Sequence, residues 1–252
     1  MKLFGKKVKT PPKDKKGSVT VILAAAGSGT RLGGISKPLM DISGKTAIEY
    51  SLEIFEVTDA VTRIVISTRE EDIPKYREIV SKRGFSKVAG IISGGSTRQE
   101  SVAKAFRFAF RDIITEFVAI HDAARPLITK QVVENAIKDA KNYGTAVCAS
   151  LCPDTVKRAN KSSFVTESVD RAGLYLIQTP QIFSYDIYST SLAVAEKDGV
   201  QATDDSSLVE NAGFKIRLTE TTRDNIKLTY PGDIHLMKAI IESRKEKNIC
   251  SE

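Results

Sequence analysis

Apolar runs alternate with amphipathic stretches along the first 150 residues. Five runs, most of them rich in β-branched residues, predict strands at Val19–Ala24, Arg63–Ser67, Val88–Ile92, Phe117–His121 and Thr145–Leu151. Stretches with helical periodicity lie between them at Ala47–Val57, Ile73–Lys82, Thr97–Arg111 and Lys130–Asn142. This alternation is typical of βαβ units. It predicts an α/β protein with a Rossmann-like, doubly wound and mostly parallel sheet.

The alternation stops at about residues 152–180. Polar residues dominate this stretch and surround an isolated Phe164 and Val165, so it has no core of its own. We predict a protruding β-arm on a single domain that spans residues 18–245. After the arm, the pattern predicts helices at Tyr185–Ala195, Asp205–Asn211 and Asp233–Lys245, and strands at Lys215–Thr219 and Ile226–Thr229.

The net charge of +7 belongs almost entirely to the first residues of the 252-residue chain. Residues 1–16 hold seven of the 38 basic and one of the 31 acidic side chains, so the remainder is close to neutral. We therefore predict a flexible lysine-rich tail over residues 1–17, and we expect neither a nucleic-acid partner nor a membrane. The apolar runs are too short to span a bilayer, which takes about 20 residues.

Cysteine and histidine are too few for a disulfide framework or a zinc site. The three cysteines have no CxxC spacing, and the chain has only two histidines. This usage indicates a reducing compartment, and we expect a cytoplasmic protein.

The first predicted strand runs into a loop of small residues, Ala24 to Gly27, and continues through Ser28, Gly29 and Arg31 to Lys37. Small residues after a strand let backbone N–H groups approach a phosphate, and the two cations add charge on the same loop. The loop is neither a Walker loop nor a complete GxGxxG pattern. A tight turn with two surface cations is the alternative.

Two further motifs follow predicted strands. Ser93-Gly94-Gly95-Ser96-Thr97-Arg98-Gln99-Glu100-Ser101-Val102 joins a strand to a helix, with a helix cap at Ser96 or Thr97. The segment His121-Asp122-Ala123-Ala124-Arg125-Pro126 places a carboxylate and a guanidinium where the fourth strand ends. A structural salt bridge is the alternative for that pair, and a packing or orienting role for His121.

Together with Asp154–Arg158, Val169–Arg171, Gln178–Gln181, Thr203–Asp205 and Asp224–Thr229, these motifs resemble the 2-C-methyl-D-erythritol 4-phosphate cytidylyltransferase family of sugar-phosphate nucleotidyltransferases. The resemblance runs from about Val19 to Ile241. It departs from the family at Ala24, where many members have proline, and at Ser36-Lys37-Pro38. A ribitol 5-phosphate cytidylyltransferase is the nearest alternative, and a catalytically silent nucleotide-binding regulator is an alternative of another class.

The resemblance implies a role for each matched residue. Four are implied to be catalytic: Arg31, Lys37, Asp122 and Lys227. The residues implied to line the nucleotide are Ala25, Ala26, Gly27, Gly94, Gly95, Ser101 and Ala123. Those implied to surround the acceptor phosphate are Arg125, Thr155, Arg171 and Thr179.

The same resemblance implies CTP and a polyol phosphate as substrates. We expect Mg²⁺ to be bound mainly by the triphosphate, with few protein ligands and with Asp122 nearby. Because a lone two-stranded arm is marginal in water, we expect the arm to pair with a second copy in a homodimer.

Overall fold

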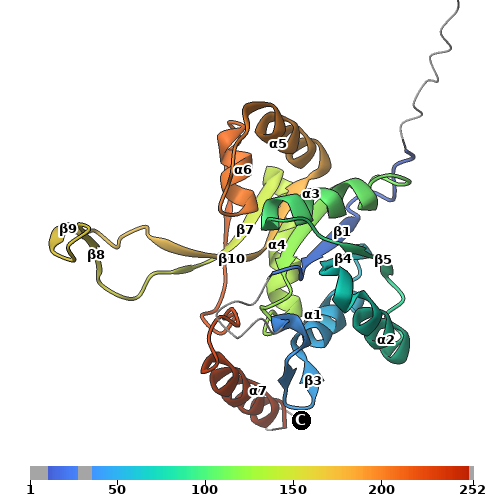
Figure 1. Ribbon diagram of the computed structural model, residues 1–252, viewed down its shortest axis with the longest axis horizontal. Helices are drawn as coiled ribbons and strands as arrows, with labels where there is room; N and C mark the ends of the chain where they lie inside the picture. Colours follow the sequence, from blue (N-terminus) through green and yellow to red (C-terminus); the bar gives the residue numbers. More distant parts are fainter. Residues whose placement is uncertain (1–10, 28–35, 250–252) are drawn as a thin grey trace, which may run out of the picture.

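A seven-stranded sheet forms the centre of the molecule (Figure 1). The computed structural model describes residues 11–27 and 36–249. The strand order is β11-β7-β10-β6-β1-β4-β5, and every neighbouring pair is parallel except the two pairs that β10 makes. The predicted doubly wound, mostly parallel α/β fold is therefore confirmed. In the described part of the chain, no helix is long and apolar enough to cross a bilayer.

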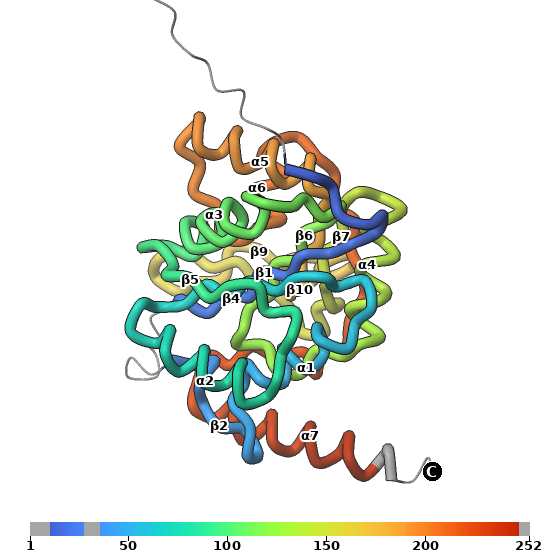
Figure 2. Tube along the Cα trace, turned by 90° about the vertical axis from the view of Figure 1, so that its right-hand side faces the viewer, coloured from blue at the N-terminus to red at the C-terminus, as the bar shows by residue number. Residues whose placement is uncertain are grey.

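Helices cover both faces of this sheet. The strands are β1 (Val19–Ala24), β4 (Val61–Thr68), β5 (Val88–Ser93), β6 (Phe117–Asp122), β7 (Thr145–Leu151), β10 (Tyr175–Ser184) and β11 (Leu218–Glu220). One face is covered by α1 (Ala47–Glu56), α2 (Ile73–Arg83) and α4 (Lys130–Tyr143). The other is covered by α3 (Arg98–Ala109), α5 (Tyr185–Asp198) and α6 (Asp205–Asn211). Figure 2 shows α3, α5 and α6 on one side of the strands and α1 and α2 on the opposite side.

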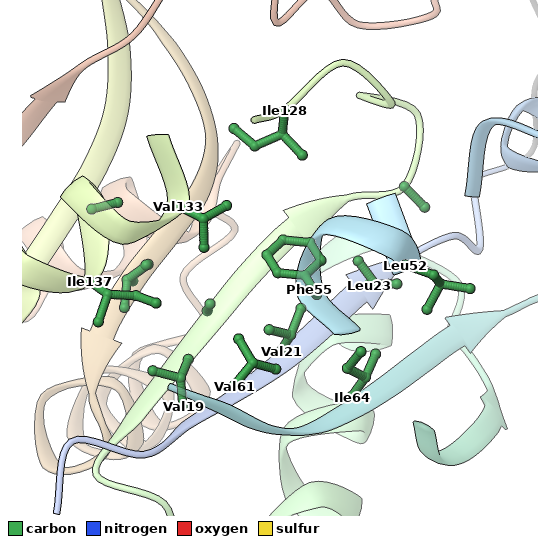
Figure 3. Close-up of a cluster of buried hydrophobic side chains, with 14 of the residues drawn as sticks. Val19, Val21, Leu23, Leu52, Phe55, Val61, Ile64, Ile128, Val133 and Ile137 are labelled. Carbon is green, nitrogen blue, oxygen red and sulfur yellow. The ribbon is translucent and has the colours of Figure 1, made fainter. Parts of the chain in front are cut away.

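Strand β1 illustrates how one strand serves two cores. Because successive side chains point to opposite faces, Val19, Val21 and Leu23 contact the core beneath α1 and α4. Ile22 contacts the other core beneath α3. All four are fully buried, and Figure 3 shows the first three beside Phe55 of α1.

A smaller third core lies below the sheet. It joins the hairpin of β2 (Asp41–Ile42) and β3 (Lys45–Thr46) to α7 (Asp233–Ile249). Leu228 is fully buried there, and its N–H donates to the carbonyl oxygen of Ala124 at 2.8 Å. The predicted strand Ile226–Thr229 is wrong, because the apolar alternation reflects this buried contact and not a ladder.

The arm leaves the body as two strands, β8 (Val156–Ala159) and β9 (Val165–Val169), which among the described strands pair only with each other (Figure 1). Strand β10 carries the chain back, pairing with β7 from Tyr175 onward.

The amino-terminal segment differs from the prediction. The Ile114 N–H donates to the Pro12 carbonyl oxygen at 2.9 Å, and Thr62 Oγ1 donates to the Asp14 carboxylate at 2.7 Å. The folded body therefore includes residues 12–17, which we expected in the flexible tail. Residues 1–10 of that tail lie outside the described residues.

Candidate active site

Two cavities lie at the carboxyl ends of the parallel strands, where α/β proteins bind ligands. The first has a volume of about 370 Å³ and lies between the end of β1 and the loop that precedes α3. The second, of about 650 Å³, lies between the base of the arm and α6. Of the residues that the structure describes, Arg98, Asp122 and Lys227 line both cavities. A group bound in one cavity therefore meets a group bound in the other at this boundary.

Small residues form one wall of the first cavity. Ala24, the last residue of β1, and the three residues that follow it line this wall, and the Ala25 N–H donates to the carbonyl oxygen of Ser67 at 2.8 Å. Among the described residues, a Cβ on Gly27 would contact nothing within 4 Å. Lys37 lines the same cavity at the start of a 3-10 helix, Lys37–Leu39. Arg31 lies outside the described residues.

The segment Gly95–Arg98 forms another wall of the first cavity, and Ser101 fixes the backbone at Gly94-Gly95. Ser101 is buried; its Oγ accepts from the Gly95 N–H at 2.9 Å and donates to the Thr97 carbonyl oxygen at 2.7 Å. A Cβ on Gly94 would lie 2.7 Å from both the Ala26 Cβ and the Ser101 Oγ. Glycine is therefore required where this loop passes the end of β1.

Two predicted nucleotide-binding residues, Gly94 and Ala123, are not among the described residues that line the first cavity. Ala123 is fully buried in the core beneath α1, and its N–H donates to the Ala24 carbonyl oxygen at 3.1 Å. Its neighbour Ala124, from the same motif, is among the described residues that line the first cavity. The turn after β6 directs the Ala123 side chain into the core, and its contact with the nucleotide stays a prediction.

Asp122 is held between two cations. Its Oδ1 lies 3.1 Å from Arg98 Nε, and its Oδ2 lies 2.6 Å from Lys227 Nζ. Burial opposes ionisation of the Asp122 carboxyl, but the two cations outweigh burial and hold its pKa well below its usual range. A carboxylate thus separates two cations at the boundary of the cavities.

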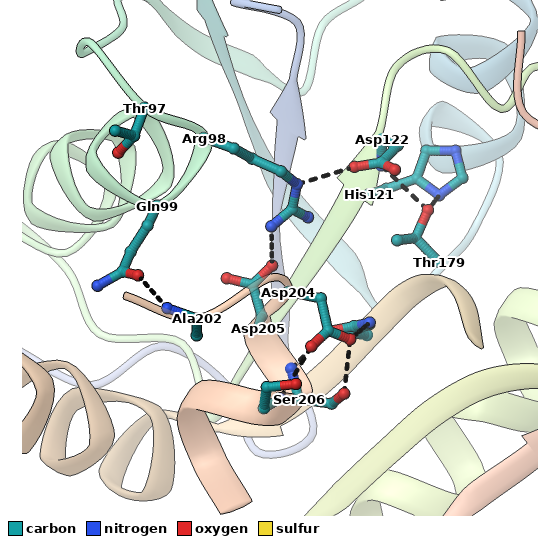
Figure 4. Close-up of polar contacts among 12 residues, drawn as sticks. Thr97, Arg98, Gln99, His121, Asp122, Thr179, Ala202, Asp204, Asp205 and Ser206 are labelled. Carbon is teal, nitrogen blue, oxygen red and sulfur yellow. Dashed lines mark hydrogen bonds and ion pairs between the residues drawn. The ribbon is translucent and has the colours of Figure 1, made fainter. Parts of the chain in front are cut away.

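Thr179 and His121 support Asp122 from behind. The Asp122 N–H donates to Thr179 Oγ1 at 3.0 Å, and the same Oγ1 lies 3.1 Å from His121 Nδ1 (Figure 4). His121 Nε2 lies 3.1 Å from the Arg125 carbonyl oxygen, which only accepts, so Nε2 carries the proton and Nδ1 accepts from Thr179. Burial lowers the pKa of His121 to about 4, so it is neutral near pH 7. Its position fits an orienting role.

Arg125 lines the second cavity from the turn after β6. Its Nη1 donates to the Asn225 carbonyl oxygen at 2.7 Å, whereas its buried Nε has no hydrogen-bond partner in the described structure. Burial lowers the pKa of this guanidinium, and Asp122 opposes that shift. Thr179 lines the same cavity.

The two predicted arm residues are not brought together with the rest within one chain. Thr155 and Arg171 are exposed, and Arg171 Nη1 donates to the Pro153 carbonyl oxygen at 2.6 Å. Neither belongs to the described residues that line the two cavities. Thr155 lies beside β8 and Arg171 shortly after β9 on the protruding arm (Figure 1).

The sequence motifs did not indicate a role in the site for two charged residues, Arg98 and Asp205. Arg98 Nη1 lies 2.7 Å from Asp205 Oδ2, and Asp205 is 3% exposed at the first turn of α6. Both lay inside motifs that we singled out, the Gly-Gly-x-x-Arg stretch and Thr203-Asp204-Asp205. Arg98 is distinguished in the structure by lining both cavities while it contacts two carboxylates.

The fold and this site define an α/β nucleotide-binding protein with a second polar cavity for another substrate. The model of the family described as 2-C-methyl-D-erythritol 4-phosphate cytidylyltransferase (IspD) matches residues 19–243. The chain belongs to this family.

Individual proteins with the family's name are similar to this chain in sequence and in fold. A relative of that name from Clostridium botulinum is 37% identical over 224 residues, which are 88% of this chain and 97% of the relative. The crystal structure of a protein of the same name from Thermus thermophilus is 27% identical, has a TM-score of 0.73 and covers 88% of this chain and 98% of its own. The crystal structure of 4-diphosphocytidyl-2C-methyl-D-erythritol synthase from Anaerococcus prevotii shares the fold. It is 24% identical, has a TM-score of 0.79 and covers 90% of this chain and 97% of its own.

Proposed function

We propose that this protein transfers the cytidylyl group of CTP to 2-C-methyl-D-erythritol 4-phosphate and releases pyrophosphate, a step of non-mevalonate isoprenoid synthesis. The observation that supports this proposal most directly is that Arg98, Asp122 and Lys227 line both cavities and mark the boundary between them. CTP occupies the first cavity and the polyol phosphate the second. The family membership favours this acceptor over ribitol 5-phosphate.

The reaction needs positioning and charge neutralisation. A phosphate oxygen of the acceptor attacks the α-phosphorus of CTP, and the bond from that phosphorus to the oxygen of the leaving pyrophosphate breaks. Both reactants are anions that repel each other, so the catalyst has to hold them in line and offset their charge. Lys227 faces both cavities, and Arg125 faces the acceptor. Lys37, with Arg31 by resemblance, holds the triphosphate.

The charged groups fit a magnesium ion that is held mainly by the substrate. Among the described residues, no cluster of three or more histidine, cysteine or acidic side chains is suited to a metal. Asp122 is the carboxylate at the boundary, and both of its oxygens already contact cations. We propose that Mg²⁺ binds triphosphate oxygens with Asp122 nearby, and that when bound it supplies further charge neutralisation.

We also propose that two copies exchange arms. Phe164 and Val165 at the arm tip are 72% and 62% exposed, and Leu176 and Ile177 at its base are 51% and 41% exposed. Exposed apolar groups on a two-stranded arm are suited to contact with another chain. A homodimer would cover them and bring Thr155 and Arg171 to the partner's acceptor cavity.

The free, buried Cys148 agrees with a reducing compartment such as the cytoplasm.

One assay tests the proposed reaction directly. Purified protein is mixed with CTP, Mg²⁺ and either 2-C-methyl-D-erythritol 4-phosphate or ribitol 5-phosphate, and pyrophosphate release is measured. We expect release with the first acceptor and much less with the second. A preference for ribitol 5-phosphate would change the acceptor, and no release with either would leave a nucleotide-binding regulator.

Gly94→Ala is expected to weaken CTP binding. The added Cβ would press on Ala26 and Ser101, which line the nucleotide cavity. Overpacking costs about 1–3 kcal/mol, and moving the loop to relieve it should displace the CTP site; a cost of about 1.4 kcal/mol in the bound complex raises the KM for CTP about tenfold. Gly232→Ala is the matched control, because a Cβ there meets nothing within 4 Å. An unchanged KM for CTP with a lowered melting temperature would make Gly94 a packing residue only.

A further inference from the structure

Arg98 is placed where a cation is unfavourable unless it is compensated. It is the first residue of α3, and the amino end of a helix repels positive charge. Burial disfavours its charged form, but Asp205 and Asp122 outweigh burial and raise the pKa of the guanidinium above its usual value. Buried ion networks contribute little net stability. The arrangement therefore calls for a role in positioning.

The contacts form one continuous chain across four elements. Tyr188 of α5 is fully buried, and its hydroxyl donates to Asp205 Oδ1 at 2.6 Å. Asp205 of α6 holds Arg98 Nη1, and Arg98 Nε holds Asp122 at the end of β6 (Figure 4). Lys227 completes the chain at the other oxygen of Asp122.

Gln99 makes a second connection between the start of α3 and the segment that precedes α6. Gln99 Nε2 donates to the Val200 carbonyl oxygen at 3.0 Å, and its Oε1 accepts from the Ala202 N–H at 2.9 Å. The beginning of α3, which carries the glycine loop of the first cavity, is thus fixed to the segment that leads into α6. Residues of α6 and its cap, including Asp204 and Ser207, line the second cavity.

We propose that Asp205 and Arg98 are positioning residues that set Asp122 and Lys227 at the boundary of the two cavities. Asp205 acts through Arg98, because it is 3% exposed and is not among the described residues that line either cavity. Arg98 spans two carboxylates through two different nitrogen atoms, a geometry that lysine does not reproduce. The inference rests on the proposed function.

Asp205→Asn and Arg98→Lys test the proposal in the pyrophosphate-release assay. A shift of about 1 Å at reacting groups costs on the order of 10²-fold, so we expect each variant to lose about that factor in kcat while the KM for CTP stays within a few-fold. The double variant should lose little more than either single variant, because both break the same chain. Tyr188→Phe keeps the carboxylate and the guanidinium, and we expect a smaller loss of about 3- to 10-fold, which is the net effect of one ordinary hydrogen bond.

Arg107→Gln is the matched control. Arg107 also lies on α3 and pairs with Glu196 of α5, but both side chains are more than half exposed and far along the helix from the cavities. We expect its activity to equal that of the unmodified protein. Circular dichroism and the melting temperature of each variant establish that the compared proteins are folded.

Three results would overturn the inference. They are a kcat of folded Asp205→Asn within twofold of the unmodified protein, losses that multiply in the double variant, and a loss confined to the melting temperature. If Asp205→Asn does not fold, Tyr188→Phe decides, and full activity in it overturns the proposal. An inactive unmodified protein would instead refute the proposed function.

Discussion

Replacing Lys227 with methionine is expected to lower kcat by on the order of 10²–10³, the usual effect of removing one preorganised group that stabilises transition-state charge. Lys227 Nζ lies 2.6 Å from Asp122 and lines both cavities, so its charge lies where the acceptor phosphate meets the triphosphate. Methionine keeps the unbranched stem of the side chain without its ammonium group. Asp122 keeps Arg98 as a partner, so the fold should persist.

Lys215→Met is the matched control for this loss of charge. Lys215 is exposed before β11 and is not among the described residues that line the cavities. Its kcat and KM should stay close to those of the unmodified protein. Near-normal turnover of folded Lys227→Met would remove Lys227 from the mechanism.

Two inactive variants are expected to restore activity to each other when they are mixed. Arg171→Ala damages the arm, and Lys227→Met damages the body. If arms are exchanged, each heterodimer has one site with both lesions and one site with neither, so it should reach about half of the unmodified activity. In a fully exchanged equal mixture, about half of the dimers are heterodimers, so the mixture should reach about a quarter.

Subunit exchange has to be shown independently, with a tag on one variant. Arg158→Ala is the matched arm control, because Arg158 is an exposed arm arginine that pairs with Glu167 within the hairpin. We expect it to be active alone. Demonstrated heterodimers without any recovery would place Arg171 in its own subunit's site and refute arm exchange.

Local sequence patterns located the parallel part of the fold well. Each of the strands β1, β4, β5 and β6 contains a short apolar run, so their positions could be predicted directly from the sequence. Strand β10 was missed because Gln178, Thr179 and Pro180 interrupt its apolar pattern, and proline is rare in a central strand. Its place between β6 and β7 depends on distant partners, which local periodicity does not contain.

The candidate site, too, could be predicted only in part from the sequence. The motifs identified Asp122, Arg125, Thr179 and Lys227, and all four line the second cavity. Asp122 and Arg125 could be placed because they follow a predicted strand, whereas Thr179 lies within β10 and Lys227 lies outside the strands. The relation of Arg98 to Asp205 was not predictable, since 107 positions separate them in the chain. The direction of Ala123 into the core depends on the turn after β6, which composition does not reveal.

Strand β10 also sets the order in which a nascent chain can complete its sheet. Among the strands that the structure describes, β7 pairs with β10 and β11 alone, and β10 is also the neighbour of β6. While the ribosome is still making the arm, β6 therefore has an open edge and β7 still awaits both of these partners. Pairings between distant segments form slowly, and an open edge invites pairing with other chains. During translation of the arm both β6 and β7 therefore have open edges; β10 closes the edge of β6 once residue 184 has emerged, and the other edge of β7 stays open until β11 has emerged at residue 220.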